Sequence, residues 1–350
     1  MTNPGLSPEE GKRRKRVLYE CLEAGFAPPS VKGKGLKPAI IEAARRLDIP
    51  ANTMRSYLSA VEADGGGIDW GRWNDPREVK EQTPLIAKPI VRVRAAKPTG
   101  KPIRVVVPGD MHDDPSLPSD RFEWIGKYVA KSKPDFFVDI GDSISFESLC
   151  SYIPNETFNG RLKGTFEEDL RSADEAYTRL YKHFPQETKR LKCRGNHEHR
   201  LFLYEDRNPE IMGMMQGEYR RLLEKHEITE APFGEWVFIG AVGFVHVPLN
   251  KMGKPYGGRN PCNQIVNDAT FDIVFGHTHN KHSTQAPKLG PQNHVSVHNV
   301  GCALPWGFVE EYAKLSNAGW WWGIHEFEIQ GGQIQSTREI TMQQLEREFG

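Results

Sequence analysis

The chain has 350 residues, 38% of them hydrophobic and 26% charged, as expected for a globular protein with one large domain and a small second one. Its 46 basic and 46 acidic residues cancel, so net charge indicates no partner, and neither a membrane span nor a secretion signal is recognisable. Five scattered cysteines without a CxxC pair argue against a disulfide or zinc-knuckle framework and favour a reducing cytoplasm, in a bacterium or a phage-infected host.

Residues 1–64 are expected to form a small all-α domain. Within them, the segment 38–58 places small and apolar side chains at helical spacing, then a turn, then a second helix. This pattern resembles the helix-turn-helix of DNA-binding regulators, with Asp48 where a glycine is usual, because Asp can adopt the left-handed conformation. The resemblance implies that the second helix meets the major groove through Asn52, Thr53, Arg55 and Ser56.

Residues 65–100 contain three consecutive glycines, two tryptophans and several prolines, which is typical of a linker. From residue 101 to 340, short apolar runs alternate with amphipathic stretches, the pattern of an α/β domain. The expected helices cover 120–132, 167–184 and 199–228, the last as a cap beside the site. The expected strands cover 103–110, 135–142, 190–196, 236–247, 271–279 and 294–301.

Side chains that commonly bind metals follow five of these strands, and most of them come after a glycine that permits close backbone approach. Asp and neutral His suit divalent Mn, Fe or Zn. Two such ions carry four positive charges and the two carboxylates return only two, so the site stays cationic. Two ions about 3.5–4 Å apart can share a hydroxide and bind the phosphoryl oxygens of a substrate. The expected ligands are Asp110, His112, Asp142, Asn196, His246, His277 and His279.

The motifs GDMH, GD, GNHE, a lone His and GHTH together resemble the calcineurin-like metallophosphoesterases over residues 103–330. The resemblance implies an α/β (α+β) fold of four layers, two mixed sheets between helices. It implies that Asp142 bridges two ions, one held by Asp110, His112 and His279 and the other by Asn196, His246 and His277. It also implies that His197 contacts phosphate and assists the leaving group, as a protonated imidazole can near neutral pH.

Other residues near these motifs narrow the assignment. Protein Ser/Thr phosphatases carry GDxHG and GDxVDRG, whereas this chain has GDMHDD and GDSISF, which argues against that subfamily. Val247 replaces the usual Gly after His246, so that ligand is the least secure of the set. Asp113 and Asp114 are expected in a solvated acidic turn. Arg194 and Arg200 flank GNHE and would bind phosphate through their guanidinium forks; the alternative is two surface arginines.

Three functions fit the sequence. A DNA-directed phosphodiesterase, a nuclease, would use both halves of the chain, a layout that resembles genes of phages and mobile elements. The alternative is a phosphatase or phosphodiesterase on a small molecule or protein, with a regulatory N-terminal module; eleven basic and eight acidic residues among 1–65 are weak evidence for DNA. A catalytically silent DNA-binding protein is least favoured, because every expected ligand is present. Manganese is the favoured metal, and the sequence leaves the oligomeric state open.

Overall fold

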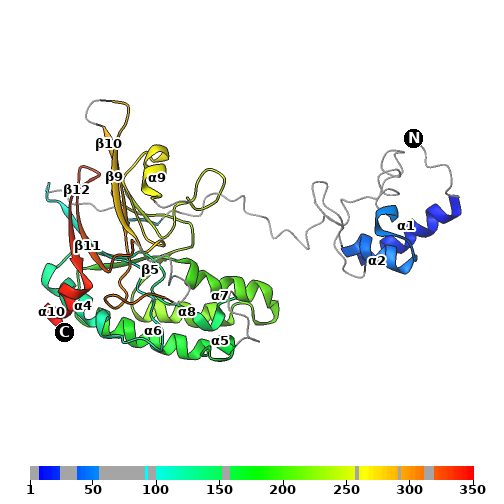
Figure 1. Ribbon diagram of the computed structural model, residues 1–350, viewed down its shortest axis with the longest axis horizontal. Helices are drawn as coiled ribbons and strands as arrows, with labels where there is room; N and C mark the ends of the chain where they lie inside the picture. The colour runs from blue at the N-terminus through cyan, green and yellow to red at the C-terminus, as the bar shows by residue number, and fades with distance from the viewer. Residues whose placement is uncertain are drawn as a thin grey trace. The chain divides into compact units, whose positions relative to one another are not determined.

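The computed structural model describes residues 8–23, 38–54, 91–93, 100–151, 158–256, 260–290, 293–310 and 319–350. The chain divides into two compact units, Met1–Lys88 and Pro89–Gly350, which are considered separately below (Figure 1). Among the described residues, no helix has the length and apolar character that a bilayer crossing requires.

The first unit contains helices α1 (Pro8–Glu23) and α2 (Pro38–Arg46). After α2, Asp48 adopts a left-handed φ of 53°, and the amide of Ile49 donates to the carbonyl of Ala44 at 3.0 Å, the bond of a Schellman helix end. Helical residues resume at 51–54. The turn at Asp48 is therefore present as expected, but most of the second helix lies outside the described residues, and DNA binding stays a prediction. This unit has its own core: Leu18, Cys21, Ile40, Ala43, Ala44, Leu47 and Met54.

The second unit contains two six-stranded mixed sheets within its described residues. In the first sheet, four parallel strands follow one another and two antiparallel strands extend the edge. Their order across the sheet is β12 (Gln333–Thr341), β11 (Gly323–Gln330), β2 (Ile103–Pro108), β3 (Phe136–Asp139), β4 (Lys189–Cys193) and β5 (Thr229–Ala231).

In the second sheet, β7 pairs in parallel with β8, and β8 pairs in parallel with β10. The order is β1 (Val91–Val93), β6 (Val237–Ile239), β7 (Val242–Val245), β8 (Ile273–Phe275), β10 (His294–Val300) and β9 (Lys281–Pro287). The single strand expected at 236–247 is instead the β6–β7 hairpin, because Gly240, with φ of 62°, reverses the chain. Strand β1 lies within the stretch that the sequence suggested as linker.

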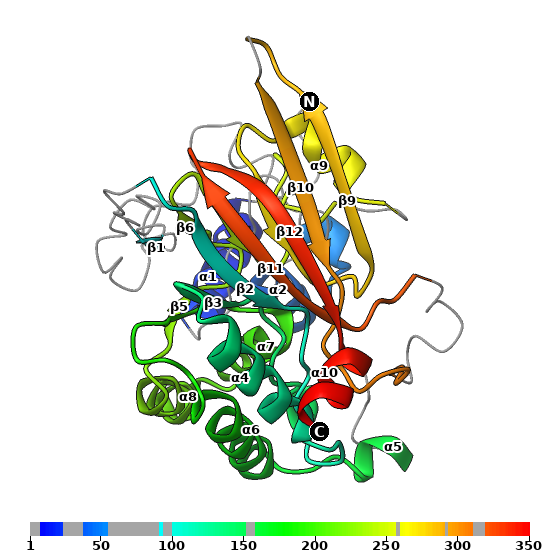
Figure 2. The ribbon, with the colours of Figure 1, turned by 90° about the vertical axis from the view of Figure 1, so that its left-hand side faces the viewer.

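Helices cover both outer faces, so the predicted four-layer sandwich is confirmed (Figure 2). Alternation along β2 shows how it is built: Val105 and Val107 pack between the sheets, whereas Val106 faces the helices. Helix α9 (Cys262–Asp268) packs against the other sheet. The helices on the β2 side are α4 (Asp120–Ser132), α6 (Phe166–Tyr181), α8 (Met214–Lys225) and α10 (Met342–Phe349), with α7 (Asn196–Arg207) beside them and the short α5 (Phe158–Arg161) before α6.

The prediction of one long helix over 199–228 is wrong in one respect, because the structure divides this stretch into two helices. Helix α7 ends at Arg207, a 3₁₀ turn covers Pro209–Ile211, and α8 begins at Met214. The proline and Gly213, with φ of 86°, cannot continue the first helix. Buried side chains of α8 then pack into the helical layer.

Candidate metal centre

The expected ligands come together where the parallel strands of both sheets end. Asp110 follows β2, Asp142 follows β3 and Asn196 follows β4, and these strands are neighbours. In the other sheet, His246 follows β7 and His277 follows its neighbour β8. The carboxyl ends of parallel strands share one edge of a sheet, so the topology brings distant motifs into one place.

The first group of ligand atoms belongs to Asp110, His112 and His279, which are all buried. Nε2 of His279 lies 3.3 Å from Oδ2 of Asp110, and the Nε2 atoms of His112 and His279 are 3.1 Å apart. One carboxylate oxygen and two imidazole nitrogens that face each other at this distance suit one divalent cation.

The second group contains Asp142, His246 and His277. Nε2 of His246 lies 3.1 Å from Oδ2 of Asp142 and 3.0 Å from Oδ1 of Asn196. Its other nitrogen, Nδ1, lies 3.1 Å from the carbonyl oxygen of Ile140; a proton on Nδ1 leaves the Nε2 lone pair facing the ligand oxygens, as in metal-binding histidines. The structure thus places His246 with the other expected ligands despite Val247.

The negative charges around the second group of ligands favour a positive charge at this position. Burial disfavours the charged form of His246, but the carboxylates of Asp142, Asp110 and Glu198, with Asp142 first among them, together outweigh burial and raise the pKa of His246 to about 9. A divalent cation would meet the same demand, in competition with the proton. Asp142 also shares a group with His112, so it lies between the two sets of ligands, where a bridging carboxylate belongs. The residues present therefore fit two divalent ions.

Glycines allow the loops to approach this closely. A Cβ added at Gly195 would lie 2.0 Å from Oδ1 of Asp142, and one at Gly276 would lie 2.3 Å from Oδ1 of Asp110. Both distances are too short for any side chain. Four expected ligands also have a left-handed backbone, with φ of 43°, 50°, 74° and 57° at His112, Asp142, His277 and His279. Such clustering of unusual conformations is common at functional sites.

A comparison with protein families gives the same answer. The model of the family described as calcineurin-like phosphoesterase matches residues 103–281. The chain belongs to the calcineurin-like phosphoesterase family. It is accordingly a metal-dependent phosphoesterase, a hydrolase of phosphate esters. A comparison with curated proteins found no match.

In this phosphoesterase, His197 lies beside both groups of ligands. Its backbone amide donates to Oδ1 of Asp142 at 2.8 Å, and its ring lies edge-on to that of His112, with centroids 4.4 Å apart. Nδ1 lies 3.0 Å from the carbonyl oxygen of Ser145 and Nε2 lies 3.2 Å from Nη2 of Arg200. Burial lowers the pKa of His197 well below its ordinary value, against the opposing effect of Asp142. These contacts suit a ring that donates from Nδ1 to the Ser145 carbonyl, and the role of His197 towards the leaving group stays a prediction.

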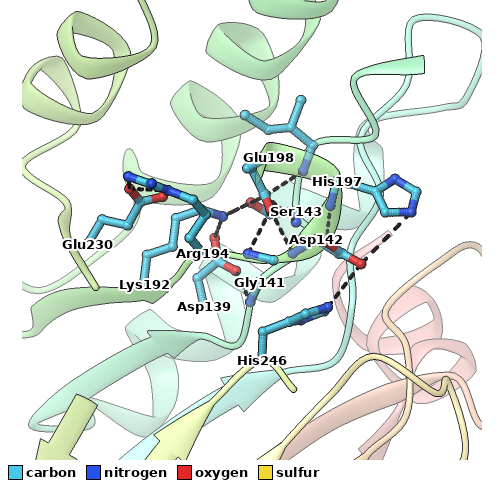
Figure 3. Close-up of polar contacts among 12 residues, drawn as sticks. Asp139, Gly141, Asp142, Ser143, Lys192, Arg194, His197, Glu198, Glu230 and His246 are labelled. Atoms are coloured by element: carbon cyan, nitrogen blue, oxygen red, sulfur yellow. Dashed lines mark hydrogen bonds and ion pairs between the residues drawn. The ribbon is translucent and has the colours of Figure 1, made fainter. Parts of the chain in front are cut away.

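The two arginines that flank GNHE have different surroundings. Arg200 reaches His197 and donates to the carbonyl of Ser145 at 2.9 Å, so its charge lies at the edge of the centre. Arg194 donates from Nε to Glu230 at 3.0 Å, and its guanidinium carbon lies 3.7 Å from the centroid of the Phe202 ring. Figure 3 shows Arg194 directed towards Glu230 and away from His197. The structure therefore brings Arg200, but not Arg194, to the ligands.

The acidic turn after His112 differs from the sequence expectation. Asp113 is only 2% exposed, so the prediction of a solvated side chain is wrong for Asp113, while Asp114 remains partly exposed. Burial raises the pKa of Asp113 to about 6, and the charge of Arg121 opposes that shift. Arg121, also buried, donates to the carbonyls of Met111 at 2.9 Å and His112 at 3.1 Å. This arginine thus fixes the backbone of the first ligand loop.

Sequence reasoning missed two further neighbours of the ligands. Oε1 of Glu310 lies 3.2 Å from Nδ1 of His112, so this carboxylate lies beside the ring of a ligand, at the nitrogen that does not face His279. The ring of Trp320 lies edge-on to that of His279, with centroids 4.2 Å apart. No local pattern marks either residue, because each lies far along the chain from the ligand that it contacts.

Proposed function

We propose that this phosphoesterase is a DNA-directed phosphodiesterase, a nuclease, that uses two divalent ions, with manganese favoured over iron or zinc. The observation that carries the hydrolytic part is the buried ligand set around Asp142. Asp110, His112 and His279 would hold one ion, and Asn196, His246 and His277 the other, with Asp142 shared. When bound, two such ions supply Lewis acidity to phosphate oxygens and lower the pKa of water.

The chain's own residues would bind and orient the ester. Arg200 places a guanidinium within 3.2 Å of Nε2 of His197, where it would attract a phosphate oxygen. His197 would donate a proton from Nε2 to the departing oxygen in its protonated form, with the ring oriented by the contact between Nδ1 and the Ser145 carbonyl. Both side chains lie in α7, which begins at the ligand Asn196, so their distance from the ligands is set by one rigid element.

DNA is supported as the substrate by the first unit. The turn at Asp48 and the helical residues 51–54 follow the helix-turn-helix pattern, and Asn52 and Thr53 are exposed while Met54 is buried. Exposure on this side is what contact with a major groove requires. Arg55 and Ser56 lie outside the described residues. The competing proposal, a phosphatase or phosphodiesterase for a small molecule or protein, shares the same centre and differs in its substrate and in the role of this unit.

The substrate test uses purified protein in Mn²⁺, and then in Fe²⁺ and Zn²⁺. It is offered p-nitrophenyl phosphate, bis-p-nitrophenyl phosphate, and single-stranded and double-stranded DNA. Cleavage of the diester and of DNA is expected, fastest in Mn²⁺. Hydrolysis of the monoester alone, with DNA intact, would reject the nuclease in favour of a phosphatase. If none of the substrates is hydrolysed with any of the metals, the result would favour a catalytically silent DNA-binding protein.

The role of the first unit is tested separately by removing residues 1–65. We expect weaker DNA binding and slower DNA cleavage, with hydrolysis of bis-p-nitrophenyl phosphate unchanged. The replacement Thr53→Ala in the full chain should act in the same direction, with Ile41→Ala as its control, because Ile41 is exposed on α2, before the turn. Unchanged DNA affinity after the deletion would show that the unit serves another partner.

A further inference from the structure

A buried lysine lies behind the ligand loops. Lys192, in β4, is fully buried, and its Nζ lies 2.8 Å from Oδ2 of Asp139 and 2.9 Å from Oε1 of Glu198. It also contacts the hydroxyl of Ser143. Both carboxylates are buried as well. Figure 3 shows Lys192 between these side chains, on the opposite side of Asp142 from His197.

Glu198 connects this lysine to the ligand loops. It accepts hydrogen bonds from the amide of Asp142 at 3.0 Å and from the amide of Gly195, which precedes the ligand Asn196, also at 3.0 Å. It accepts two more from the next two amides of the β3 loop, Ser143 at 2.8 Å and Ile144 at 3.1 Å. One carboxylate thus joins the loop that carries the shared ligand to the loop that carries its neighbour.

Asp139 provides a second connection. Its Oδ1 accepts from the amide of Gly141 at 2.9 Å, and this residue directly precedes Asp142. Lys192 therefore pairs with one carboxylate in β3 and one in α7. Each carboxylate in turn accepts a hydrogen bond from the backbone of a ligand or of the residue before one. A further contact, from the hydroxyl of Ser143 to that of Tyr177 at 2.7 Å, joins the same group to α6.

The free-energy cost of burying these charges indicates that the network does more than stabilise the fold. Removing an ammonium and two carboxylates from water costs several kcal/mol per ion, and buried ion pairs are often no more stabilising than apolar side chains of the same size. Burial disfavours the charge of Lys192, but Asp139 and Glu198 outweigh it and raise the pKa of Lys192 well above its ordinary value. The lysine therefore stays charged, and an apolar residue would fill the same space without this cost.

We propose that Lys192 is a positioning residue for the metal centre: through Glu198 and Asp139 it fixes the backbone of the loop that carries Asp142 relative to the loop that carries Asn196, and so increases the affinity for divalent ions. Loss of an outer partner of this kind usually weakens metal binding by about 10–100-fold. The proposal rests on the metal centre and is independent of DNA as substrate.

The experiment measures Mn²⁺ binding by calorimetry on chelator-treated protein, together with Tm and bound metal by elemental analysis. The variants are Lys192→Met, which keeps the length of the side chain, and Asp139→Asn, which leaves Lys192 balanced by Glu198. The control is Asp272→Asn. Asp272 is also buried and accepts two backbone amides, from Ser296 at 2.8 Å and Ile334 at 2.7 Å, but it precedes β8, at the end opposite to His277.

We expect Lys192→Met to bind Mn²⁺ about 10–100-fold more weakly than the wild type, and Asp139→Asn to show a smaller loss. Asp272→Asn should lose Tm at unchanged affinity. If Lys192→Met loses Tm as the control does but keeps wild-type affinity, the lysine only stabilises the fold and the proposal is overturned. If Lys192→Met does not fold, wild-type affinity in Asp139→Asn overturns it. A wild-type protein that binds no Mn²⁺ would reject the metal centre itself.

Discussion

Gly195→Ala should damage the metal centre through a single added methyl group. Gly195 has φ of −84° and ψ of 177°, which alanine adopts without strain, so any effect comes from contacts alone. The new Cβ would lie 2.0 Å from Oδ1 and 2.2 Å from the backbone nitrogen of Asp142. Heavy atoms at such sites need more than 3 Å, so the loop that carries Asp142 must move by about 1 Å.

That movement has a cost in stability and a larger cost in function. Overpacking by one methyl group typically costs ~1–3 kcal/mol, and in a unit of this size each kcal/mol lowers Tm by ~2–4 °C. We therefore expect Tm of the metal-free protein to fall by roughly 2–12 °C. The same shift would break the hydrogen bond from the amide of His197 to Asp142. Misplacement of a reacting group by about 1 Å can reduce turnover about 100-fold.

Gly217→Ala is the matched control. Gly217 lies in α8, and an added Cβ there meets nothing within 4 Å. Alanine is the better helix former by ~0.5–1 kcal/mol, so Tm should rise slightly while Mn²⁺ binding and diester hydrolysis stay unchanged. Calorimetry, Tm and bis-p-nitrophenyl phosphate turnover are measured on both variants. If Gly195→Ala keeps wild-type metal content and turnover, the loops are not held as closely as the structure shows, and the reasoning fails.

Three further changes test separate parts of the site and fold. Asp142→Asn should abolish activity and lose both ions in elemental analysis; retained activity would contradict its shared position. His197→Ala should lower turnover about 10²–10⁴-fold at unchanged metal content, and loss of metal would identify it as a ligand. Partial burial raises the pKa of Asp174, but hydrogen bonds from Lys225 and His226 outweigh it and leave the pKa lowered. Its ionised form therefore stabilises the fold above about pH 4, so the Tm deficit of Asp174→Asn should disappear as pH falls below that value; a constant deficit would refute the linkage.

The ends of the strands that carry ligands were predictable because each ligand motif has a recognisable local sequence pattern. A short apolar run followed by Gly and Asp, as at Asp110 and Asp142, combines a strand with the tight turn that ends it. Parallel strands then place such ends at one sheet edge, so the order of the motifs was enough to predict the centre. The split of 199–228 at Pro209 was also readable from the proline, but the helical pattern on both sides obscured it.

The surroundings of the ligands were not predictable, for a physical reason. The contact between Glu310 and His112, like the packing of Trp320 on His279, depends on how loops from both sheets meet, and neither has a periodic pattern. Lys192 is one of three basic residues in β4, which reads KRLKC, so the sequence alone does not single it out, and its two carboxylate partners lie 53 and 6 residues away. The register of β3 against β4 places Asp139 beside Lys192, whereas Glu198 is brought to the same ammonium by the start of α7.

Attraction of phosphate and selection of a substrate have different origins in this chain. Histidines provide four of the seven expected ligands and carboxylates only two, so a centre loaded with two divalent ions keeps a positive charge that attracts any phosphate ester. The proposed preference for DNA would then have to come from groups that contact the rest of the substrate. Trp306, 49% exposed in the loop that leads to Glu310, could stack on a base, whereas the first unit would raise the local concentration of DNA. Stacking would change kcat/KM for short diesters that carry a base, while tethering would change it for long DNA alone, so the dependence of kcat/KM on substrate length distinguishes the two sources of specificity.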